Sequence, residues 1–321
     1  MNVAAFVLLA AMLAAYVLLD GYDLGVGAVH LLFSRTDRGR AAAFAAIHPF
    51  WNGNEVFLIA SGAALFALFP KAYAAAFSGF YLPLIIVLWL LMVRGMSIEL
   101  RGHFESELWR GFWDVAFCIA SALLAFVLGL AMGNLVRGVP FNGSGYFQGT
   151  FAFLLNGYAL AVGALALLAL SMHGAAFLWM RVDDELRESA RRLTRFLWPL
   201  VAVAFIGVTA ATVIAHPITG HPGLWIAPIA ALVALASVAF AKKVALALAG
   251  SSVFLLALMA SAAQTLFPHL LPAFPSGTGL DIYNAAPNAY SVGTAFTAAL
   301  IGVSAALIYG TIAALRMMRA K

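Results

Sequence analysis

Apolar stretches about as long as a bilayer is thick recur along the chain, and they decide what it can fold into. Of the 321 residues, 64% are hydrophobic and 10% are charged, whereas soluble domains carry about 25% charged residues. A helix needs ~20 apolar residues to cross a bilayer core of ~30 Å. We therefore expect an all-α, polytopic membrane protein that forms a single transmembrane domain over residues 1–321.

Nine stretches have the length and composition of a membrane-spanning helix. They cover residues 3–33, 50–69, 74–98, 113–135, 149–179, 195–215, 223–240, 244–267 and 292–315. The polar joints between them are short, which leaves no room for a soluble domain. The longest joint outside the membrane, residues 268–291, is rich in Pro, Gly and Asn and is expected to be irregular.

Basic residues indicate the orientation of these spans. All but Lys71 and Arg137 of the 18 lysines and arginines fall in alternate joints or after the last span. Because cytoplasmic loops of membrane proteins are enriched in Lys and Arg, we expect the N-terminus outside and the C-terminus in the cytoplasm. The formal net charge of +5 is then a topology signal, and nucleic acid is not an expected partner.

The first predicted span contains two acidic residues. In the stretch LLDGYDLGVGAVHLL, Asp20 and Asp23 lie three residues apart, which puts both on one helix face. Gly21 and Gly25 favour close packing of another helix. A carboxylate inside a span costs about 2.5 to 3.5 kcal/mol and commonly faces a bundle interior or an aqueous path. Asp20 and Asp23 are therefore proton-path candidates, with a buried structural hydrogen bond as the alternative.

A second polar stretch, HPFWNGNEVFL, opens the second span and adds Glu55 as a third proton-path candidate. More polar and ionisable residues fall toward the same predicted cytoplasmic side. We group them as a predicted polar cluster of Trp51, Asn52, Arg94, Glu99 and Asp114, with His173 near the same ends. These groups could form a funnel for proton uptake. Equally, pairs such as Glu55 with Arg94 could only neutralise charges so that they tolerate burial.

Cofactor ligands are sparse in the sequence. Cys118 is the only cysteine, which excludes a CxxC metal site and a CxxCH haem attachment. The predicted topology puts none of the histidines at mid-membrane, and no HxxxH pair occurs; they are His30, His48, His103, His173, His216, His221 and His269. We therefore expect no haem or metal held wholly by this chain, and we assign no catalytic residue to it.

Five motifs occur in order along the chain: DGYDLGVG, HPFWNGNEVFL, YAAAFSGFYLPLIIVLWLLMVRG, FWDVAF and GNLVRGVPF. Together they resemble subunit II of the cytochrome bd quinol oxidases, densely over the first five spans. The resemblance implies a heterodimer in the bacterial cytoplasmic (inner) membrane. Its subunit I, of homologous fold, would bind two b-type haems and one d-type haem, oxidise quinol and reduce oxygen to water.

The resemblance also implies the role of this chain. Subunit II binds none of the haems, supports the complex and, in some members, contributes a cytoplasmic proton-uptake route. A structural quinone, lipid and a small single-helix accessory subunit are further partners that the resemblance allows.

Two positions depart from the pattern of the family. Asp20 and Asp23 match its first-helix acids and Trp51 its second motif. The next position usually holds an acid associated with the proton route but is Asn52 here, and Phe57 replaces a usual tryptophan. Asparagine cannot carry a proton by titrating. The hypothesis is that Glu55 takes over this role, or that protons enter through subunit I alone.

Two other functions fit the same pattern. A proton-coupled secondary transporter would explain intramembrane acids without a partner, although inverted repeats and broken midplane helices, which are usual in such transporters, are not evident. A purely structural membrane subunit is the second alternative.

Overall fold

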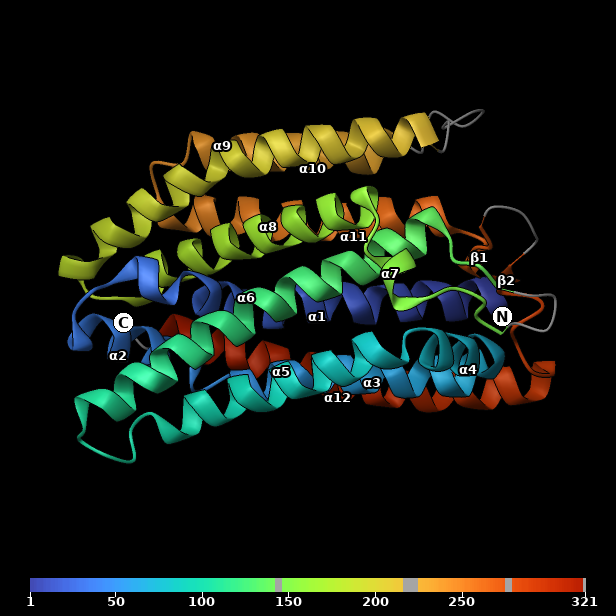
Figure 1. Cartoon of the computed structure of the whole chain (residues 1–321), viewed down its shortest axis with the longest axis horizontal. Coiled ribbons are helices and arrows are strands. Elements are labelled where there is room, and N and C mark those ends of the chain that lie inside the picture. Colours follow the sequence, from blue (N-terminus) through green and yellow to red (C-terminus); the bar gives the residue numbers. More distant parts are fainter. Residues whose placement is uncertain (142–145, 216–224, 275–278, 320–321) are drawn as a thin grey trace.

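The computed structural model describes residues 1–141, 146–215, 225–274 and 279–319. Helices dominate these residues and run roughly parallel to the long axis of the molecule (Figure 1). In chain order the elements are α1 (Asn2–Phe33), α2 (Asp37–Ile47), α3 (Trp51–Leu68), α4 (Pro70–Gly79), α5 (Tyr81–Leu100), α6 (Glu107–Arg137), α7 (Phe151–Leu154), α8 (Gly157–Arg181), α9 (Asp184–Ala215), α10 (Ile226–Ala239), α11 (Val244–Leu266), β1 (His269–Leu271), β2 (Leu280–Asp281) and α12 (Ala289–Arg319).

Helix α1 lies at the centre of the bundle. It packs most extensively against α8, α6, α3 and α11, and it also contacts α2, α9 and α12. The pair α9 and α10 forms one edge of the bundle, and α3, α4, α5 and α12 lie at the opposite edge (Figure 1). The two acids predicted in the first span are therefore held in the middle of the molecule.

Six helices of the described chain are long and apolar enough to cross a membrane. They are α1, α5, α6, α8, α11 and, within α9, Leu186–Ile214. Helix α10 and the segment Ala289–Ala305 of α12 are apolar but shorter. A mostly helical, multi-pass protein is thus confirmed, whereas the nine spans and the orientation of the termini stay predictions.

The expected span over residues 74–98 is two helices. The break falls at Phe80, between α4 and α5. Pro83 lies in the first turn of α5. Because proline has no N–H, it cannot bond the carbonyl of Gly79 four residues earlier. A continuous helix here would leave that carbonyl without its bond, and the chain breaks at this point.

The expected span over residues 149–179 is also interrupted. It contains the single turn α7 and then α8, whose N-cap is Asn156. The Asn156 side chain accepts a hydrogen bond from the N–H of Ala159 at 3.0 Å, as N-cap residues commonly do. Two joints expected between spans are helical as well, since α2 follows α1 and α9 begins at Asp184 instead of near residue 195.

The segment expected to be irregular, residues 268–291, contains the antiparallel pair β1 and β2 in its described part; residues 275–278 lie outside it. This segment is tied to the end of α6. Gly138 ends α6 with a φ of +91°, a conformation that favours glycine. The turn lets the N–H of Val139 donate to the carbonyl of Pro272 at 2.9 Å.

The closest helix crossing in α1 is its contact with α8 at Gly25 and Gly174. A Cβ on Gly25 would overlap the backbone carbonyl of Leu170, and a Cβ on Gly174 would overlap the backbone of Gly25 and Val26. The two backbones therefore touch directly, which is the close approach that small residues permit between membrane helices.

We predict that Gly25→Ala destabilises the protein. The added methyl group must push α1 away from α8, and overpacking of this kind costs about 1 to 3 kcal/mol. The midpoint of thermal unfolding in detergent should fall. Gly62→Ala is the matched control, because a Cβ on Gly62 meets nothing within 4 Å. Equal midpoints for the two variants would contradict the prediction.

Candidate functional site

A salt bridge that joins three helices contains the most buried charged side chains of the described chain. The guanidinium of Arg94 on α5 donates to Asp20 Oδ1 on α1 at 2.8 Å and to Glu55 Oε1 on α3 at 2.6 Å. The side chains of Arg94 and Asp20 are 0% exposed, and that of Glu55 is 25% exposed. The bridge therefore runs from the interior to the surface of α3.

Asp23, the second acid of α1, accepts a hydrogen bond from an amide side chain. Asn54 Nδ2 on α3 donates to Asp23 Oδ2 at 2.7 Å and to the hydroxyl of Tyr22 at 2.8 Å. Asp23 is 1% exposed and Asn54 is equally buried. Asn54 adjoins Glu55 in the chain, so α3 brings one amide to Asp23 and one carboxyl to Arg94. Asn54 lies inside the second motif but is not among the site residues predicted from the sequence.

Several buried polar atoms around this bridge have no hydrogen-bond partner among the residues that the structure describes. They are Asp20 Oδ2, Asp23 Oδ1, Arg94 Nε, Trp51 Nε1 and the Tyr16 hydroxyl. Buried polar atoms are normally bonded to protein groups or to ordered water. These atoms are thus points where water or a polar ligand group can bind. We call Tyr16, Asp20, Asp23, Asn54, Glu55 and Arg94 the α1 polar site.

The predicted polar cluster does not come together as one group. Trp51 is buried beside Gly95 of α5, next to Arg94. Asn52 is exposed at the start of α3. Glu99 is exposed as well, and its carboxylate lies 3.8 Å from His48 Nε2. Asn52 and Glu99 each lie on the outer face of their helix, apart from Arg94, which a list of polar positions does not show.

Asp114, the last member of the predicted cluster, belongs to a separate network. Its carboxylate accepts from His30 Nε2 at 2.9 Å, Arg101 Nε at 2.6 Å and Arg40 Nη1 at 3.3 Å. Arg101 also reaches Asp37 at the start of α2, at 2.7 Å. This network joins α1, α2, α6 and the end of α5. It fixes that end of the bundle and does not extend to Arg94.

The two buried histidines of the described chain are hydrogen-bonded within the bundle, His173 through both ring nitrogens and His30 through one. His173 Nε2 on α8 lies 3.2 Å from the carbonyl of Leu18, to which it can donate, and Nδ1 lies 2.8 Å from Ser251 Oγ on α11. His30 Nε2 is bonded to Asp114. His173, expected near a helix end, instead bridges α1, α8 and α11.

No group of three or more His, Cys, Asp and Glu that could hold a metal occurs among the described residues. His216 and His221 lie outside them. Of the two buried histidines, His173 has both ring nitrogens hydrogen-bonded, whereas His30 Nδ1 has no partner among the described residues.

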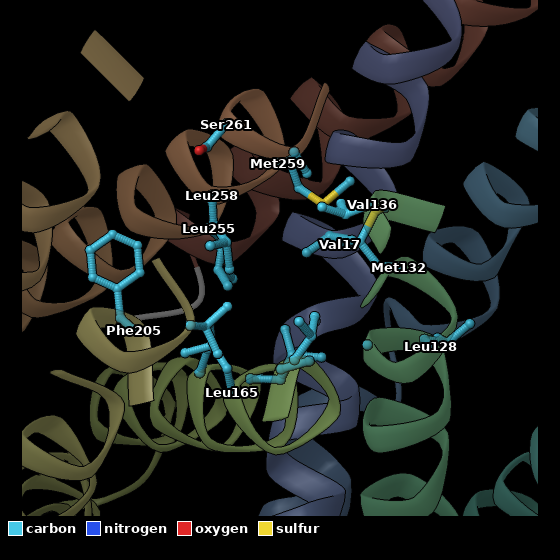
Figure 2. Close-up of a pocket in the computed structure, with 18 of the residues that line it drawn as sticks. Val17, Leu128, Met132, Val136, Leu165, Phe205, Leu255, Leu258, Met259 and Ser261 are labelled. Atoms are coloured by element: carbon cyan, nitrogen blue, oxygen red, sulfur yellow. The ribbon is translucent and has the colours of Figure 1, made fainter. Parts of the chain in front are cut away.

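A cavity of about 220 Å³ adjoins the α1 polar site. Side chains from α1, α6, α8, α9 and α11 line it, and Figure 2 shows Val17, Met132, Leu165 and Leu258 around it. The lining is almost entirely apolar. Tyr16 also lines the cavity, and it precedes Asp20 by one helical turn on the same face of α1.

The sequence matches known proteins along its length. Residues 1–318 match the family described as "Cytochrome bd terminal oxidase subunit II". The chain is 39% identical over 209 residues to "Cytochrome bd-I ubiquinol oxidase subunit 2" of Escherichia coli, covering 63% of this chain and 55% of the relative. It is 30% identical over 310 residues to "Cytochrome bd ubiquinol oxidase subunit 2" of Bacillus subtilis, covering 92% and 89%. Thus it spans about half of the E. coli relative but most of the B. subtilis one.

The fold is also similar to that of a solved structure. A chain of "The structure of bd oxidase from Geobacillus thermodenitrificans" superposes with a TM-score of 0.79 over 100% of this chain and 99% of that chain, at 18% identity. At this identity the likeness concerns the fold alone. The family match over nearly the whole chain carries the assignment. The chain belongs to the family of cytochrome bd terminal oxidase subunit II.

Proposed function

We propose that the chain is the haem-free subunit of a quinol:oxygen oxidoreductase in a bacterial cytoplasmic membrane. Its partner is a subunit I that holds two b-type haems and one d-type haem, oxidises quinol and reduces oxygen to water. The family match over residues 1–318 supports this assignment. The haem-free part of it is supported by His173, whose two ring nitrogens are both hydrogen-bonded within the chain.

The surface around Glu55 is the face on which we place subunit I. Glu55 stands beside Val56 and Ile59, which are 51% and 72% exposed on α3. A carboxyl group on a face of this kind would be costly against lipid hydrocarbon. A partner subunit that covers α3 with a polar or hydrated patch removes that cost. The outer end of the salt bridge between Glu55 and Arg94 would then lie at the subunit interface.

The α1 polar site would carry protons inward from this interface. It holds the carboxyl groups of Asp20, Asp23 and Glu55 but the single guanidinium of Arg94 within the bridge. When all three acids are ionised, negative charge is in excess in a low dielectric, which is unfavourable. A site with such an excess accepts a proton readily. The observation that carries the proposal is the bridge itself, which extends from partly exposed Glu55 to buried Asp20.

The cavity beside Tyr16 suits a structural quinone or a lipid chain. Its apolar walls fit an isoprenoid or acyl chain, and the Tyr16 hydroxyl can donate a hydrogen bond to a carbonyl oxygen. Ligand pockets of this kind combine an apolar lining with few polar groups. The quinone would stay in place and support packing.

We predict that Glu55→Gln lowers turnover of the assembled two-subunit complex. Glutamine keeps a hydrogen bond to Arg94 but cannot titrate. Quinol-driven oxygen consumption should fall about tenfold or more, equivalent to roughly 1.4 kcal/mol of added barrier, and proton uptake should fall with it. Glu99→Gln is the matched control, because Glu99 is an exposed carboxylate on α5 outside the site.

A second variant sharpens this test. Asn52 lies one helical turn before Glu55 on α3, so Asn52→Asp in the Glu55→Gln background restores a carboxyl group nearby. We expect partial recovery of turnover. If Glu55→Gln assembles with its haems and keeps full turnover and proton uptake, Glu55 is not on the route, and protons enter through subunit I.

The bridge also predicts a stability pattern. Arg94→Met removes the partner of a fully buried carboxylate, and breaking a buried pair in this way costs about 3 to 5 kcal/mol. Adding Asp20→Asn removes the stranded charge and should recover most of the loss in thermal midpoint. Comparing the single and double variants separates a structural role of the bridge from a role in proton transfer. The double variant should be stable and yet have a low turnover. A stable double variant with normal turnover would leave the bridge a purely structural role.

We predict that Tyr16→Phe lowers the quinone retained by the purified complex. The lost hydrogen bond is worth about 0.5 to 1.5 kcal/mol, hence about two- to twelvefold in affinity. Solvent extraction followed by chromatography measures the quinone bound per complex. Val17→Phe, which fills part of the cavity, should lower it too. Tyr158→Phe is the control, because its hydroxyl is already bonded to Thr212 at 2.7 Å.

A further inference from the structure

The first turns of α9 carry basic side chains that the proposed function does not use. Arg192 and Arg195 are exposed, and the described part of the chain offers them no ion-pair partner. The nearby Glu188 is bonded to Arg191 at 3.1 Å. These two arginines are therefore available to a ligand.

Two lysines lie close to the same height in the bundle. Trp198 Nε1 on α9 donates to the carbonyl of Leu235 on α10 at 2.7 Å, which sets the two helices in register. At ~1.5 Å per residue, Arg192 lies about 9 Å from this contact along α9 and Ala239, the last residue of α10, about 6 Å from it, both toward the same end of the bundle. Lys242 and Lys243 are exposed in the turn between α10 and α11. In Figure 1 that turn lies beside α9.

The face below these cations is apolar and exposed. Phe196 lies four residues after Arg192 and Val203 seven residues after Phe196, along the same stripe of α9, and they are 63% and 73% exposed. Phe240, at the end of α10, is 80% exposed. A stripe of this kind contacts lipid chains when the helix crosses a membrane. The cations at its end then stand at the level of the lipid headgroups.

We propose that Arg192, Arg195, Lys242 and Lys243, the α9 cationic surface, bind the headgroup phosphates of anionic phospholipids. Cations beside a membrane attract acidic lipids, and arginine can hold a phosphate through two parallel hydrogen bonds. The exposed Phe196 and Val203 select a lipid over a free phosphate ion, because only the lipid has chains to cover them. The lipid occupies the edge of the bundle at α9 and α10, away from the face that bears Glu55.

The test uses the assembled complex in nanodiscs of phosphatidylcholine with a minor share of phosphatidylglycerol. Electron paramagnetic resonance of a spin-labelled lipid measures the motionally restricted fraction for each headgroup. We expect phosphatidylglycerol to be preferred at low salt. Arg192→Gln with Arg195→Gln should reduce that preference about fivefold or more, and high salt should weaken it in the native protein.

Arg35→Gln with Arg38→Gln is the charge-matched control, because both side chains are exposed elsewhere on the chain. An equal fall in this control would overturn the proposal, as would an unchanged preference in the α9 variant or competition by inorganic phosphate. If the α9 variant does not assemble, Lys242→Gln with Lys243→Gln gives the same readout from a turn outside the helices. Oxygen consumption should stay unchanged throughout, which separates this surface from the α1 polar site.

Discussion

A single guanidinium inside the bundle determines how the acidic residues of the spans can be buried. Arg94 has no exposed surface and holds Asp20 and Glu55 on two other helices. Each of these groups would be costly in a membrane alone, and the bridge makes their burial possible. It also fixes the relative positions of α1, α3 and α5 at one level. The α1 polar site and the partly exposed edge at Glu55 are both built around this bridge.

Much of this arrangement could be predicted from the sequence. Acids inside apolar runs are conspicuous, and the pairing of Glu55 with Arg94 was one of two interpretations of the pattern, because helices that follow each other in a chain commonly pack together. The bridge to Asp20 brings together residues 74 positions apart. Only the arrangement of helices in space could reveal it. The same holds for Asp114, whose partners His30 and Arg40 come from α1 and α2.

Other errors had local causes. Hydropathy treats residues 74–98 as one stretch, since an average over a window does not register the N–H missing at Pro83. Asn54 was not predicted, because an uncharged amide is a weaker signal in a membrane span than the acid beside it. Asn52 is exposed, so the departure from the family pattern lies on the outer face of α3. Asn54 and Glu55 lie closer to the interior than Asn52 does.

The contact between Gly25 and Gly174 limits how the interior can move. With the backbones of α1 and α8 touching, α1 can neither slide nor rotate against α8 without steric overlap. Asp20 and Asp23 therefore lie on a helix whose backbone is fixed against α8. Any rearrangement at these acids must come from side-chain rotation and hydration, which take place on far shorter timescales than collective helix motion. Chemistry at this level of the membrane need not wait for a conformational change of the whole subunit.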